Sequence, residues 1–133
     1  MAPIVILGGS PSATSKTAAM LDLLALRLVD HGHQGRAVPV REPPPAALLS
    51  ADTSDPAIAE VVTTIDLARR LVVASPVYTT SYTGLPKALL DLLPQHALAA
   101  GKVVCPLVTG GTQRTCWPWS TRCAQYSSRW EPW

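Results

Sequence analysis

The sequence predicts an α/β domain built on a doubly wound parallel sheet, for two reasons. First, short and continuously apolar segments, typical of strands buried on both faces, alternate with longer segments of helical periodicity. Second, the resulting order βαβαβαβ implies right-handed crossovers, which make the strands parallel. We expect strands at residues 3–7, 36–40, 71–74 and 103–108, and helices at residues 17–29, 56–67 and 84–93.

Individual residues indicate where these strands and helices begin and end. The first strand runs into a pair of glycines, and the third is expected to stop at Ser75-Pro76, where proline fixes the exit of the chain. Asp55 is expected to cap the second helix, with Pro56 at its first position. Thr83 is expected to cap the third helix.

Composition limits the classes of function. The 133 residues are enough for one core, and 47% hydrophobic residues make disorder improbable. A net charge of +2 argues against nucleic acid or a membrane surface as partner. We find neither a membrane-spanning apolar run nor a signal peptide, and we expect a cytoplasmic protein. An odd count of three cysteines in a cytoplasmic chain argues against a disulfide framework, and because the cysteines and histidines lack ligand spacing, no metal site is expected.

The main functional signal is a set of three polar loops, at residues 8–17, 75–83 and 109–112. Each follows the carboxyl end of an expected strand and is rich in Ser, Thr, Gly or Pro. In a parallel sheet these ends share one edge, and open α/β sheets bind their ligands there. We therefore expect the three loops to form one binding rim.

The first loop joins a buried strand to a helix N-terminus, where free amide groups and the helix dipole favour an anion. Hydroxyl groups add donors for a phosphate, on Ser10, Ser12, Thr14, Ser15 and Thr17. The glycine spacings of the Walker P-loop and of the dinucleotide fingerprint are absent. An ordinary polar loop with a helix cap remains the alternative.

The second and third loops suit a flat heterocycle. Tyr78 and Tyr82 are candidates to flank such a ring, and Gly110 and Gly111 let the backbone approach a ligand closely. Taken alone, each loop is equally compatible with an ordinary surface connection.

Together these motifs resemble the NAD(P)H-dependent FMN reductase family of flavodoxin-like fold, of the sulfonate-utilisation type, over residues 3–113. The resemblance implies that one loop holds the FMN phosphate through Ser10, Ser12, Ser15, Lys16 and Thr17. It implies that Pro76, Val77 and Tyr78 line the isoalloxazine ring, and that Thr109, Gly110 and Gly111 contact its far edge.

The resemblance also implies the chemistry. The flavin carries out hydride transfer from NADPH or NADH, so no catalytic side chain is required. Reduced FMN would pass to a flavin-dependent monooxygenase. A homo-oligomer of the family type is expected only with an intact C-terminal part. Two alternatives stay open: a non-catalytic, truncated flavin-binding fragment, and a quinone or azo-dye reductase of the same fold.

The resemblance ends abruptly after residue 113. Residues 114–133 contain all four tryptophans and show neither helical nor strand periodicity. Back-translated in a shifted frame, this tail gives an amphipathic sequence similar to the family's next helix, so we hypothesise a frameshift; a divergent tail is the alternative. We thus expect an incomplete FMN-binding domain at 1–113, with about four of five strands and the fourth at the sheet edge.

Overall fold

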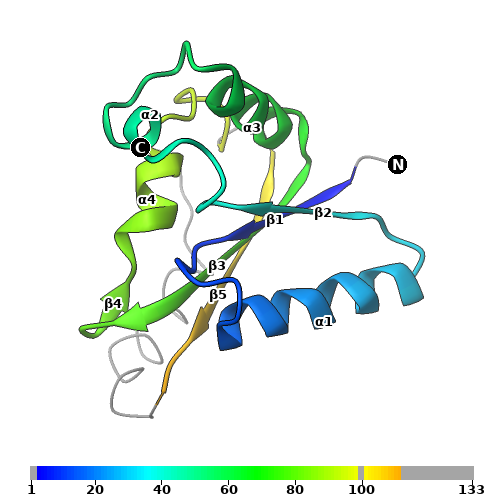
Figure 1. Cartoon of the computed structure of the whole chain (residues 1–133). Coiled ribbons are helices and arrows are strands. Elements are labelled where there is room, and N and C mark those ends of the chain that lie inside the picture. Colours follow the sequence, from blue (N-terminus) through cyan, green and yellow to red (C-terminus); the bar gives the residue numbers. More distant parts are fainter. Residues whose placement is uncertain (1–2, 99–100, 112–133) are drawn as a thin grey trace.

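The computed structural model describes residues 3–98 and 101–111. Four parallel strands form the sheet in the order β2-β1-β3-β5. They are β1 (Ile4–Gly8), β2 (Gly35–Pro39), β3 (Arg70–Tyr78) and β5 (Val103–Thr109). The predicted doubly wound α/β architecture is confirmed (Figure 1).

Helices cover both faces of this sheet. Helix α1 (Lys16–Asp30) lies on one face, and α2 (Pro45–Leu49), α3 (Pro56–Leu67) and α4 (Gly84–Leu90) lie on the other (Figure 1). The core divides accordingly. Ile4 and Ile6 of β1 pack in a cluster with Leu21 of α1, whereas Val5 and Leu7 pack in the cluster of the opposite face. Since alternate side chains of β1 meet a helical layer on each side, every residue of the strand is apolar.

The predicted stop of the third strand at Ser75-Pro76 is wrong. Strand β3 continues to Tyr78, and Val77 and Tyr78 pair antiparallel with the short strand β4 (Ser81–Tyr82). The partner strand β1 ends opposite Ala74, so the ladder on that side needs no amide donor from Pro76. The sheet therefore extends into a hairpin, which sequence analysis did not predict; it also missed α2.

The predicted cap of the second helix is confirmed, and the first helix has a side-chain cap that was not predicted. The carboxylate of Asp55 accepts hydrogen bonds from the amides of Ala57 (2.9 Å) and Ile58 (3.3 Å), with Pro56 at the start of α3. Ser15 caps α1, since its Oγ accepts from the amide of Ala18 at 3.1 Å. Thr83 occupies the N-cap position of α4, which begins at Gly84 as predicted, but its side chain makes no capping hydrogen bond.

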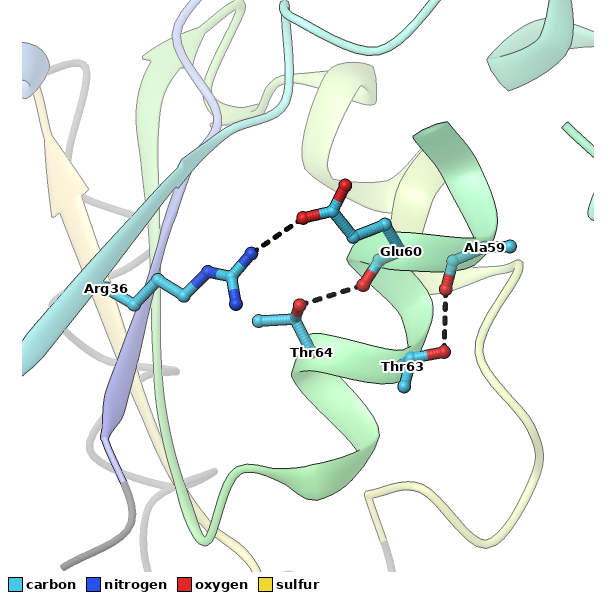
Figure 2. A network of polar contacts seen from close by, with 5 residues as sticks. All are labelled: Arg36, Ala59, Glu60, Thr63 and Thr64. Atoms are coloured by element: carbon cyan, nitrogen blue, oxygen red, sulfur yellow. Dashed lines mark hydrogen bonds and ion pairs between the residues drawn. The ribbon is translucent and has the colours of Figure 1, made fainter. Parts of the chain in front are cut away.

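A polar network joins β2 to α3 toward the amino ends of the strands (Figure 2). Arg36 of β2 pairs with Glu60 of α3 at 2.9 Å, and the hydroxyls of Thr63 and Thr64 donate to carbonyl oxygens one turn earlier in α3. The Arg36 and Glu60 side chains are 51% and 72% exposed, so the pair contributes at most about 1 kcal/mol. This end of the molecule is remote from the three polar loops.

Strand β5 is an edge strand within the described residues, as predicted, because its pairing there is with β3 alone. Val103, at its start, is 63% exposed. The tail at 114–133, with its tryptophans and the frameshift hypothesis, lies outside the described residues. The domain boundary at residue 113 therefore stays a prediction. No helix in the described ranges is long and apolar enough to cross a membrane.

Candidate functional site

The three polar loops meet at the carboxyl edge of the sheet, as predicted. Two hydrogen bonds between distant parts of the chain join them. Thr17, in the first turn of α1, contacts Thr109 at the end of β5, with 2.6 Å between the two hydroxyl oxygens. The hydroxyl of Thr83 donates to the carbonyl oxygen of Gly9 at 2.9 Å and so links the second loop to the first. The rim is thus one connected structure.

The first loop is shaped by bonds between its own side chains and backbone. Ser10 is 2% exposed, and its Oγ lies 3.2 Å from the carbonyl oxygen and 3.3 Å from the amide nitrogen of Ser12. The Oγ of Ser12 in turn accepts from the amide of Thr14 at 3.3 Å. Such turns fix the path of a loop without a regular ladder.

The predicted phosphate ligands divide into two groups. Ser12 and Lys16 are exposed and can reach a bound anion directly. Ser10 and Thr17 are buried, at 2% and 1% exposure, and their hydroxyls hold the loop and join it to Thr109. Ser15 is half-buried and occupied as the helix cap.

The N-terminus of α1 supplies further donors. Within the described ranges, the amides of Lys16 and Thr17 open the helix without an intrahelical acceptor, as the first amides of any helix do. The first turn contains no acidic residue that would oppose an anion. Together with the exposed ammonium group of Lys16, this end of the helix has the polarity that a phosphate requires.

The second loop carries two exposed tyrosines, Tyr78 and Tyr82. Pro76 and Val77 are buried, whereas Tyr78 is 56% exposed. In the hairpin, Tyr82 lies opposite Val77, and side chains alternate between the two faces. Tyr78 and Tyr82 therefore point to opposite faces of the hairpin, and which of them would contact a ring stays a prediction.

The turn of this hairpin is strained. Thr79 and Thr80 have φ angles of 50° and 62°, the left-handed values that a two-residue hairpin turn requires at both central positions. Asn and Gly adopt these angles readily, but β-branched residues do so at a cost of about 1–3 kcal/mol each. The strain lies directly beside the exposed Tyr78.

The third loop offers open backbone. Thr109 is half-buried by its contact with Thr17, and Gly110 and Gly111 are exposed. A Cβ built on Gly111 would meet no atom within 4 Å, so its main chain is open to a ligand. This agrees with the close approach that the two glycines suggested.

Three residues of the predicted loops hold the rim together but were not among the predicted site residues: Gly9, Ser75 and Thr83. Ser75 is 4% exposed and accepts from the amide of Thr83 at 2.9 Å. A Cβ on Gly9 would lie 2.6 Å from the carbonyl oxygen of Ala74 and 2.7 Å from Cγ of Pro86. The glycine pair at the end of the first strand was the available signal for Gly9; nothing in the pattern distinguished Thr83 from a helix cap.

A cavity of about 520 Å³ lies beside the rim, between α4 and β5. Its lining is mostly apolar and includes Tyr82, Pro86, Leu90, Val104 and Val108. None of the predicted phosphate ligands lines it. The cavity is therefore a neighbour of the rim and not its phosphate-binding part.

The parallel sheet, with a helix N-terminus and two further polar loops at its carboxyl edge, defines a protein of flavodoxin-like α/β fold. The family model of "NADPH-dependent FMN reductase" matches residues 2–116. The chain therefore belongs to the NADPH-dependent FMN reductase family, as the motifs suggested.

Individual proteins agree with this assignment. The chain is 38% identical over 109 residues to an FMN reductase (NADPH) of Pseudomonas putida, covering 82% of this chain and 55% of that protein. It is 32% identical over 115 residues to the NADH-dependent FMN reductase SfnE of the same species, covering 84% of this chain and 61% of the relative. The apo structure of an NADH:FMN oxidoreductase (EMOB) superposes with a TM-score of 0.82 at 39% identity, over 96% of this chain and 69% of that one. The chain thus spans little more than half the length of these curated relatives.

Proposed function

We propose that this chain binds FMN at the carboxyl edge of its sheet and reduces it with NADPH or NADH. The observation that carries the proposal is the bonded convergence of three loops, with an anion-binding helix end in the first and an exposed tyrosine in the second. Family membership supports an oxidoreductase, and the relatives' names mention both nicotinamide nucleotides.

The residues present fit FMN. The amides of Lys16 and Thr17, the ammonium group of Lys16 and the hydroxyl of Ser12 suit a phosphate. The ring would lie against Tyr78, over the buried Pro76 and Val77. The exposed Gly110 and the open main chain of Gly111 would face its far edge, with Thr109 holding that loop in place.

The chemistry of the reaction belongs to the flavin, which accepts a hydride from the nicotinamide. The protein's own part is to bind and orient. The first loop fixes the phosphate end, and the second positions the ring so that a nicotinamide can approach its open face. Backbone amides of the third loop can donate to the ring edge, where negative charge accumulates on reduction. We further propose a cytoplasmic location and a flavin-dependent monooxygenase as acceptor of the reduced FMN.

The test has two stages that separate binding from turnover. Fluorescence titration of FMN with the 133-residue chain measures binding. Anaerobic mixing with NADPH or NADH, followed by visible absorbance, measures reduction as bleaching of the flavin. Binding with bleaching supports the reductase, and binding without bleaching supports the non-catalytic flavin-binding alternative. Absence of binding would refute the site.

Tyrosine variants make the binding stage specific. Tyr78→Ala should weaken FMN by about tenfold, since ring stacking contributes roughly 0.5–1.5 kcal/mol beyond the buried area. Tyr82→Ala is the matched control, because Tyr82 points to the other face of the same hairpin. Equal losses in both variants would contradict the placement of the ring against Tyr78.

A further inference from the structure

We propose that Thr83 is a positioning residue that sets the ring-binding loop at a fixed distance from the phosphate loop. This inference rests on the proposed function and assigns Thr83 a role beyond it. The role is to hold two loops in register, so that one rigid ligand can contact both at once. Thr83 itself need not touch the flavin.

The contacts of Thr83 run to both loops. Its hydroxyl donates to the carbonyl oxygen of Gly9 at 2.9 Å, across 74 positions of sequence. Its amide donates to Oγ of Ser75 at 2.9 Å, and the hydroxyl of Ser75 donates to the carbonyl oxygen of Pro76 at 2.8 Å. One residue, through its hydroxyl and its amide, thus connects the end of β1 with the residues that precede Tyr78.

The two hydroxyls also lie next to each other, with 3.2 Å between Oγ of Ser75 and Oγ1 of Thr83. Each hydroxyl carries one hydrogen, and the carbonyl oxygens of Gly9 and Pro76 are acceptors within reach of Thr83 and Ser75 respectively. Gly9 is buried, so its carbonyl oxygen depends on a protein donor. In addition, the amide of Gly9 donates to the carbonyl oxygen of Ala74 at 2.7 Å, which ties the same residue to β3.

The sequence position of Thr83 offers a simpler role that the geometry does not support. Thr83 stands at the N-cap of α4, where a threonine ordinarily accepts from an amide of the first turn. Its side chain makes no such bond. The hydroxyl is directed instead to the preceding loop, which indicates that it serves the contact between loops.

The affinity of a ligand that contacts both loops should depend on the Thr83–Gly9 hydrogen bond more strongly than the affinity of a ligand that contacts only one loop. FMN has a phosphate for the first loop and a ring for the second. Because these two groups belong to one molecule, the affinity of FMN depends on the distance between the two loops. Riboflavin has the ring without the phosphate. A change in spacing should therefore weaken FMN and leave riboflavin nearly unaffected.

The experiment compares Thr83→Val with Thr83→Ser in the full chain. Valine keeps the shape and removes the hydroxyl, whereas serine keeps the donor. We expect Thr83→Val to weaken FMN about tenfold and riboflavin less than twofold. Without the donor, the two loops of the free protein can move apart so that water satisfies the carbonyl of Gly9, and FMN must bring them together again at a cost of about one decade of affinity. The visible circular dichroism of bound FMN should change as well. Thr83→Ser should restore both.

Thr63→Val is the matched control, since the hydroxyl of Thr63 donates to Ala59 on α3, at the remote end shown in Figure 2. It should leave both affinities unchanged. Equal losses of FMN and riboflavin in Thr83→Val, or no loss of either, would overturn the positioning role while the proposed function stands. Failure of the unmodified chain to bind FMN would overturn the proposed function and this role together.

Discussion

Gly9→Ala is the substitution whose effect the structure specifies most directly. A Cβ at this position would lie 2.6 Å from the carbonyl oxygen of Ala74, and 2.7 and 2.9 Å from two ring carbons of Pro86. These separations are well below the 3.4 Å at which ordinary contact begins. One obstacle is main chain and the other is a rigid ring, so neither can turn aside as a flexible side chain would.

The cost follows from two terms. Overpacking of a tight contact costs about 1–3 kcal/mol. Moving Gly9 away from β3 also weakens its 2.7 Å hydrogen bond to Ala74, which is worth roughly 0.5–1.5 kcal/mol. A loss of about 2–4 kcal/mol lowers the melting temperature of a domain of this size by roughly 6–20 °C. FMN should also bind more weakly, because the carbonyl of Gly9 is the acceptor for Thr83.

Gly84→Ala is the matched control. A Cβ there would meet no atom within 4 Å, and the residue begins α4. Alanine should leave the melting temperature unchanged or raise it slightly, by at most about 1 kcal/mol in stability. Thermal denaturation followed by far-UV circular dichroism measures both variants. If Gly9→Ala melts within about 2 °C of the unmodified chain, the reasoning on close approach is wrong.

Three other substitutions test separate parts of the structure. Ser15→Ala should cost about 0.5–2 kcal/mol in urea unfolding through the lost helix cap, and a loss of FMN affinity beyond that of Ser12→Ala would be inconsistent with Ser15 acting mainly as a cap. Replacing Thr79-Thr80 by Asn-Gly should raise stability by about 1–2 kcal/mol, since both residues hold left-handed angles; a lower melting temperature would contradict the strain. Lys102→Met should lower stability by about 0.3–1 kcal/mol, because the ammonium group donates to the last carbonyls of α3, among them that of Asp66 at 2.9 Å; an unchanged urea midpoint would show that water replaces it.

Much of the fold could be predicted because strands that are buried on both faces of the sheet have continuously apolar sequences. β1 is apolar at every position before its final glycine, and the sheet order follows from chain alternation. β4 has two residues, too few for any periodicity, and its pairing depends on a turn of two threonines that no turn preference favours. The end of β3 was misplaced because a proline is tolerated where its neighbour strand has stopped.

The location of the site could be predicted from the sequence, but the contacts of its individual side chains could not. Topology alone brings the three loops to one edge. Which hydroxyls face a ligand is decided by the three-dimensional path of each loop, and serine and threonine look alike in a sequence. Thus Ser12 is exposed whereas Ser10 is buried, and Thr17 faces Thr109 instead of the solvent. The flavin contacts of all these residues remain predictions that the binding experiments address.

Gly9 shows how these observations fit together. Its amide is held by β3, its carbonyl accepts from Thr83, and the space of its missing Cβ is filled by Pro86 of α4. The start of the first loop is therefore held by the chain that carries the second loop, in addition to the bonds of its own serines. In the proposed site FMN contacts both loops at once, so the contacts around Gly9 should affect its affinity more than any single hydroxyl that touches the phosphate.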